Sequence, residues 1–140
     1  MKAQVRWMDG MQFVAESGSG HAMVVDGPPD LGGRDSGPRP MELMLMSVGA
    51  CSAVDVVHIL KKARQLVEDC RVQVQAERAD SEPKVFTAIH LHFQVVGEQM
   101  KEAHVKRAVE LSAEKYCSAS LMLGKACPVT HSYSIETQLD

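Results

Sequence analysis

The stretch RPMELMLMSVGACSAVDVVHILKK, residues 39–62, decides the fold. Pro40 suits the first turn of a helix, because the N–H that proline lacks would have no helical partner there. From this point to Leu60 the residues are apolar on nearly every side, with small residues around Cys51. A helix that is apolar all round is buried all round. We therefore predict a long central helix over residues 40–66.

The length of this helix indicates that a second chain covers part of it. At 1.5 Å per residue the helix spans roughly 37 Å, which is long for the centre of a 140-residue chain. Small side chains in its middle are expected to let another helix approach closely. These are Ser47, Gly49, Ala50, Ser52 and Ala53.

The composition excludes several classes of function. Glu42, Asp55 and His58 interrupt the apolar window and argue against a bilayer span. The start, MKAQVRWMDG, has no apolar run after Lys2 and is not expected to be a signal peptide. The net charge is −3 and the basic residues are dispersed, so nothing favours nucleic-acid binding. We expect a cytoplasmic protein, without a membrane or nucleic-acid partner, whose cysteines are mostly reduced.

The residues before the helix predict an antiparallel β-meander over residues 1–27. In the first two of three segments polar and apolar residues alternate, and the third also has the composition of a strand. Asp9-Gly10 gives a strong hairpin signal between the first two. The strands are expected at residues 2–8, 11–17 and 21–27. Residues 28–39 form a loop rich in proline and glycine. A loop of this length in a compact domain is usually functional or mobile.

Residues 70–140 predict a β-hairpin, a helix and a C-terminal strand. Strict alternation marks the two hairpin strands, and an amphipathic pattern follows over residues 100–117. The helix then continues, or restarts after a kink, and ends at Gly124. After Pro128 the alternation returns. The element order is β-β-β-α-β-β-α-β, which predicts a single α+β domain over residues 1–140 with antiparallel sheets.

Two cysteines begin the same three-residue step, Cys-Ser-Ala, at Cys51 and Cys117. A free cysteine is often a small buried hydrophobe, so inert packing is one interpretation. If the two helices are neighbours, the thiols can meet and act as a redox couple, which is the other interpretation. Asp55 and His58 share the helix face of Cys51, and Glu114 lies three residues before Cys117.

The remaining cysteines and the histidines give weaker signals. Cys70 and Cys127 read as structural, and the spacing of the four cysteines matches no zinc pattern, so no metal or other cofactor is expected. His90 and His92 alternate onto one strand face, where His131 could join them around a metal. A solvent-facing strand surface is the favoured interpretation of these histidines.

The helix stretch above and AEKYCSASLML, residues 113–123, together resemble the OsmC/Ohr family of osmotically inducible and organic-hydroperoxide-resistance proteins. The element order fits over essentially the whole chain, and the match is closest to an OsmC-like branch. The resemblance implies an intertwined homodimer whose antiparallel sheets wrap around two long central helices. It also implies that Cys51 is the peroxidatic thiol and Cys117 the resolving thiol. Organic hydroperoxides would be the substrates, and a dithiol would restore the enzyme.

The chain departs from the family at two activating positions. In the family an Arg from the N-terminal strand region and a Glu at the helix start activate the cysteine. Here the Glu position falls on Met41, with Glu42 one residue later, and Arg39 or Arg34 would have to replace the Arg. These departures keep a second hypothesis open. It is a non-catalytic dimer of the same fold that binds an apolar small molecule at its interface.

Overall fold

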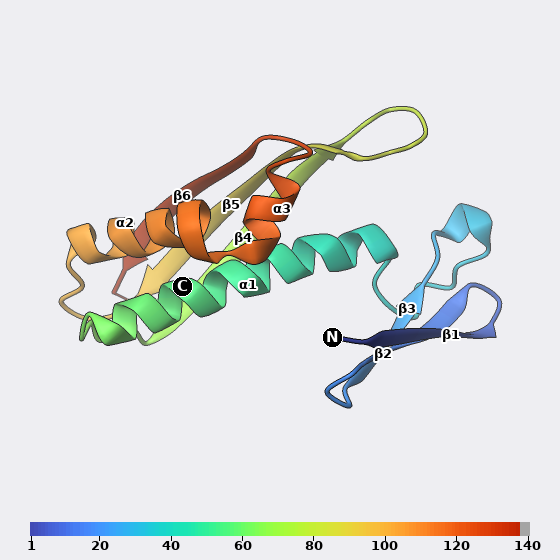
Figure 1. Cartoon of the computed structure of the whole chain (residues 1–140), viewed down its shortest axis with the longest axis horizontal. Helices are drawn as coiled ribbons and strands as arrows, with labels where there is room; N and C mark the ends of the chain where they lie inside the picture. The colour runs from blue at the N-terminus through green and yellow to red at the C-terminus, as the bar shows by residue number, and fades with distance from the viewer. Residues whose placement is uncertain (138–140) are drawn as a thin grey trace. The chain divides into compact units, whose positions relative to one another are not determined.

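The structure, a computed structural model, describes residues 1–137 and divides the chain into two compact units, Met1–Met44 and a second that begins at Leu45 (Figure 1). The elements are β1 (Ala3–Asp9), β2 (Gln12–Ser17), β3 (Ala22–Asp26), a 3-10 turn (Pro29–Leu31), α1 (Pro40–Lys62), β4 (Asp69–Arg78), β5 (Phe86–Val96), α2 (Glu102–Leu111), a π-helical turn (Ser112–Tyr116), α3 (Ser118–Leu123) and β6 (Val129–Glu136). The predicted order is confirmed, whereas the single domain stays a prediction.

The first unit contains the predicted antiparallel meander. Strand β2 pairs with β1 on one side and with β3 on the other. The first hairpin turns at the predicted place, where Gly10 has a φ of 55° that glycine adopts without steric cost. The indole N–H of Trp7 donates to the Gly10 carbonyl oxygen over 2.8 Å and closes the turn.

Asp26 organises the loop over residues 28–39, and sequence reasoning missed this residue. Its carboxylate accepts hydrogen bonds from the backbone N–H groups of Gly27, Arg34 and Ser36. The Ser36 hydroxyl donates a further bond of 2.6 Å and is the main reason that the pKa of Asp26 is lowered to about 2. An ionised carboxylate at the end of β3 therefore folds the loop.

Helix α1 begins at Pro40 as predicted but ends at Lys62, so the predicted end at residue 66 is wrong. Arg64 has a φ of 58°, and the Gln65 N–H donates to the Leu60 carbonyl oxygen over 3.0 Å. This bond across a left-handed residue is the Schellman ending of a helix. Glycine usually fills the left-handed position, and an arginine there gave the sequence analysis no signal.

The second unit contains a mixed sheet of β4, β5 and β6, so the prediction of antiparallel sheets is wrong for its last strand. Strands β4 and β5 form the expected antiparallel hairpin. Strand β6 pairs with β5 in parallel, with Ile89 opposite Val129. The chain leaves β5, crosses through α2 and α3 and returns in the same direction, as helical crossovers do.

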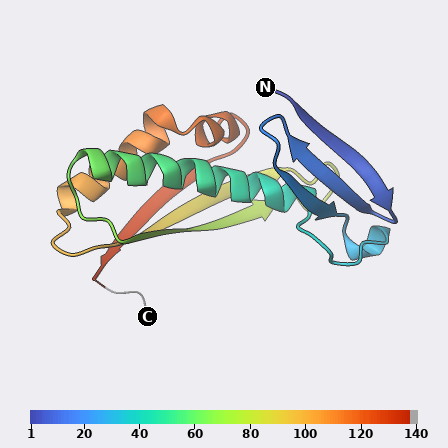
Figure 2. The same cartoon turned by 90° about the horizontal axis from the view of Figure 1, so that it is seen from below.

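Helices cover one face of this sheet (Figures 1 and 2). The covered face carries the inward residues of β5, which are almost fully buried. These are Ile89, Leu91, Phe93 and Val95. Helix α1 lies close to the sheet at Gly49, where an added Cβ would stand 3.0 Å from Val74. At this position the neighbour of the small residue is therefore a strand, and not the helix that was expected.

Much of the apolar surface of α1 is exposed in this chain, whereas the sequence predicted burial on every side with part of the cover from a second chain. The side chains of Met46 and Val54 are 54% and 69% exposed. The helix is long and apolar enough to cross a membrane, a test that central helices of soluble proteins also pass. The expected burial therefore requires something beyond this chain.

The second long helical segment breaks at Cys117, so of the two predicted alternatives the helix restarts after a kink and does not continue. Helix α2 ends at Leu111, and one π-helical turn carries the chain to Tyr116. Cys117 has extended backbone angles, φ −74° and ψ 99°, and caps α3. The break removes Cys117 from regular helix and turns its side chain into the interior.

Candidate functional site

Cys117 is fully buried, and two donors point at its sulfur. The hydroxyl of Ser52, on α1, lies 3.1 Å from the Cys117 Sγ and donates to it. The backbone N–H of Ser120 lies 3.4 Å from the same atom. That N–H is free to bind sulfur because it lies in the first turn of α3, where backbone donors have no helical partner. The break at Cys117 therefore creates one donor, and α1 supplies the other.

The structure places Cys51 near Cys117. Cys51 is partly exposed on α1, and it lies close enough to Cys117 for each thiol to shift the pKa of the other. The backbone N–H of Ala119, in the second Cys-Ser-Ala step, lowers the pKa of Cys51. The two steps therefore lie together: Ser52 of the first bonds to the cysteine of the second, and Ala119 of the second acts on the cysteine of the first.

The environments shift the pKa values of the two thiols in opposite directions. At Cys51 the Ala119 N–H lowers the pKa, but burial, the bond to Cys117 and the charges of Cys117 and Asp55 raise it overall. At Cys117 burial raises the pKa, but the bonds from Ser52, Ser120 and Cys51 outweigh it and lower the pKa overall. A negative charge on the pair is therefore better solvated at Cys117.

Three further predicted site residues lie in the second unit with the cysteines. Asp55 accepts a hydrogen bond of 3.2 Å from the hydroxyl of Ser112, and its charge is the smallest of the effects that raise the pKa of Cys51. His58 is exposed and, with Asp55, lines a hollow of about 500 Å³. Glu114 is exposed on the π-helical turn. Of the three, Asp55 has the clearest link to the thiols.

The predicted activating residues Arg39, Arg34 and Glu42 lie in the first unit, where they pair with one another or with Asp9. The Arg39 backbone N–H donates to Glu42 over 3.1 Å, and the two side chains approach to 4.0 Å. The Arg34 guanidinium donates to Asp9 over 3.2 Å. Each guanidinium therefore already faces a carboxylate within its own unit.

Sequence reasoning missed a polar chain that leads from the buried Cys117 through Ser120 to the half-buried His131 of β6. The Ser120 hydroxyl helps to lower the pKa of Cys117 and lies 3.4 Å from Nε2 of His131. The His131 ring stacks on Phe93 at 6.1 Å between centroids, and burial, followed by the charge of His90, lowers its pKa. The repeated Cys-Ser-Ala step contains Ser52 but not Ser120, so it gave no signal for this chain.

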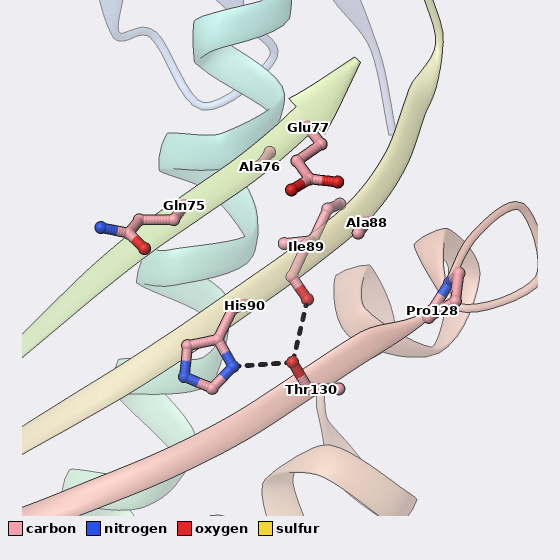
Figure 3. A pocket seen from close by; sticks show the side chains of 8 residues that line it. All are labelled: Gln75, Ala76, Glu77, Ala88, Ile89, His90, Pro128 and Thr130. Atoms are coloured by element: carbon pink, nitrogen blue, oxygen red, sulfur yellow. Dashed lines mark hydrogen bonds between the residues drawn. The ribbon is translucent and has the colours of Figure 1, made fainter. Parts of the chain in front are cut away.

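The less favoured interpretation, a metal held by three histidines, is wrong, because His131 lies on the opposite face of the sheet from His90 and His92. His131 pairs with the buried Leu91 in the strand register and faces the helices. His90 bonds to Thr130 over 2.7 Å, beside an open hollow of about 500 Å³ on the other face (Figure 3). The hollow contains no cysteine, and its histidine is already committed to hydroxyl partners.

Known proteins can now be compared with this fold and site. The OsmC-like protein family matches residues 33–132. The chain belongs to the OsmC-like protein family. Protein YhfA of Escherichia coli strain K12 is 52% identical over 135 residues, which cover 96% of this chain and 98% of that protein.

Solved structures of OsmC-like proteins share the fold. The crystal structure of a hypothetical protein from Aquifex aeolicus VF5 has a TM-score of 0.86 and 30% identity, and the match covers 99% of this chain and 97% of that one. An organic hydroperoxide resistance protein OsmC from Legionella pneumophila has a TM-score of 0.70 and 20% identity, with 95% of each chain covered. The chain is therefore an α+β protein of the OsmC-like family, and it shares its fold with a protein named as an organic hydroperoxide resistance protein.

Proposed function

We propose that this OsmC-like protein reduces organic hydroperoxides through Cys51 and Cys117, with a dithiol as reductant. The closeness of the two thiols, each of which shifts the pKa of the other, carries this proposal, because a redox couple needs two sulfur atoms that can approach to bonding distance. The partial exposure of Cys51 and the full burial of Cys117 suit a peroxidatic and a resolving thiol, respectively. The family, with its hydroperoxide resistance proteins, supports the same chemistry.

The reaction proceeds in three steps. The Cys51 sulfur attacks the terminal hydroperoxide oxygen, the O–O bond breaks, and Cys51 sulfenic acid and an alcohol form. The Cys117 sulfur then attacks Cys51, an S–S bond forms, the S–O bond breaks and water leaves. An external dithiol reduces this disulfide by exchange and becomes a disulfide itself. No cofactor takes part.

The proposal includes a cytoplasmic homodimer. A partner chain would cover the exposed apolar side chains of α1, such as Met46 and Val54. A reduced cytoplasm would keep the two cysteines as thiols between catalytic cycles. We assign supporting roles to Asp55, His58 and Glu114 through their place in the unit that holds the thiols, and to Arg39 and Glu42 through the family resemblance.

A second function is favoured by one observation at Cys51. Its pKa is raised, so its thiol is less ionised than an ordinary cysteine and is a weaker nucleophile. This fits a non-catalytic dimer that binds an apolar small molecule. The hollow beside α1, which is lined in part by Ile59, Leu111 and Tyr116, is a site for such a ligand.

The test is consumption of cumene hydroperoxide in the presence of a dithiol. We expect turnover by the native protein and its loss in Cys51→Ser, because this variant lacks the thiol that attacks the hydroperoxide. Cys70→Ser is the matched control, since it removes a thiol outside the pair, and it should retain turnover. Equal rates in the native protein and Cys51→Ser would remove the enzyme and leave the binding function.

A further inference from the structure

We propose that Cys117 is the resting thiolate of the pair, held by Ser52 and Ser120, and that it takes the proton of Cys51 as Cys51 attacks the hydroperoxide. The second cysteine thus acts as the base that activates the first, in addition to resolving it. The reaction with a hydroperoxide rests on the proposed function. The position of the negative charge on Cys117 does not, and it can be tested without a substrate.

The donors around the two sulfurs differ in number and in kind. Cys117 receives a hydroxyl bond of 3.1 Å from Ser52 and a backbone N–H bond of 3.4 Å from Ser120. At Cys51 the Ala119 N–H lowers the pKa, but burial, Cys117 and the Asp55 charge raise it overall. Hydrogen bonds from donors favour the charged form of a thiol, and a nearby carboxylate opposes it. The charge therefore settles on Cys117, and Cys51 keeps the proton.

The ionisable groups that face the pair agree with this arrangement. Asp55, from α1, raises the pKa of Cys51. From β6, His131 reaches the pair through the Ser120 hydroxyl, and burial holds its pKa below the usual value for histidine. At neutral pH His131 is therefore neutral and does not draw the charge away from Cys117.

The proton and the electrons balance in this scheme. As the Cys51 sulfur bonds to the terminal oxygen, its proton moves to the Cys117 sulfur and the O–O bond breaks, which leaves an alkoxide. The alkoxide takes that proton and becomes the alcohol, which restores the Cys117 thiolate. The thiolate then attacks the sulfenic sulfur, and the departing hydroxide takes a proton from solvent. The cysteines lose two electrons in total, and the hydroperoxide gains them.

The experiment follows thiolate absorbance at 240 nm in the reduced protein as the pH rises from 5 to 10. We expect the lowest thiolate transition to persist in Cys51→Ser and to disappear in Cys117→Ser. In Ser52→Ala it should move up by about one pH unit, because the thiolate loses its hydroxyl donor. Ser118→Ala is the matched control: Ser118 holds the same place in the other Cys-Ser-Ala step but is exposed, and its transition should not move.

Two results would overturn the inference. One is a lowest transition that survives in Cys117→Ser and disappears in Cys51→Ser. The other is a transition that stays in place in Ser52→Ala while circular dichroism shows a native fold. Neither readout involves a hydroperoxide, so a protein without peroxidase activity still gives a clear answer on the thiolate.

Discussion

The two Cys-Ser-Ala steps have the same sequence but different backbones. Cys51 lies within the continuous helix α1, whereas Cys117 lies at the break between the π-helical turn and α3. Ser52 is buried and donates to a sulfur, whereas Ser118 is exposed. The comparison teaches that a thiol's chemistry depends on which donors its backbone leaves free, because Cys117 gains the Ser120 N–H only through the break.

The largest expected effect comes from replacing Cys117, the cysteine of the second Cys-Ser-Ala step. Cys117→Ser should lose multiple turnover with hydroperoxide and dithiol, because it removes both the base that takes the Cys51 proton and the thiol that resolves Cys51 sulfenic acid. Dimedone labelling followed by peptide mapping should detect sulfenic acid at Cys51 that forms more slowly than in the native protein. Full turnover in Cys117→Ser would show that Cys51 sulfenic acid is resolved without Cys117. Cys51 and Cys117 would then not form a redox couple.

A smaller effect is expected at Cys70, a thiol outside the pair that can be compared with Cys51 and Cys117. Burial and the charge of Asp69 raise its pKa to about 11, against an ordinary value of 9.0. At neutral pH its thiolate fraction is lower by about 100-fold, and alkylation slows in proportion. Iodoacetamide should therefore modify Cys70 about 100-fold more slowly in the native protein than in urea. Comparable rates would mean that burial alone does not suppress a thiol in this fold.

Much of the fold was readable from local patterns in the sequence. Pro40 marked the start of α1, and Asp9-Gly10 marked the first hairpin. The parallel pairing of β6 was not readable, because alternation shows that a strand exists but not the direction of its neighbour. The end of α1 was missed because Arg64 occupies a position where glycine is the usual signal.

The two cysteines of the candidate site could be predicted from the sequence, but the hydrogen-bond donors around them could not. The repeated step singled out Cys51 and Cys117, and in the structure each thiol lies close enough to shift the pKa of the other. Ser52, Ser120 and His131 gave no separate signal, since a serine or histidine in an apolar segment is common and its partner is distant in sequence. Asp26 was missed for the same reason, because its partners come from the loop that it folds.

The central claim is that the two sulfur atoms are neighbours and form a reversible bond. The direct measurement treats the reduced protein with one equivalent of cumene hydroperoxide, digests it without reductant and maps the peptides by mass spectrometry. The account predicts one linked pair, the peptide with Cys51 joined to the peptide with Cys117, which a dithiol separates again. Oxidised protein whose Cys51 and Cys117 peptides stay unlinked would contradict the account.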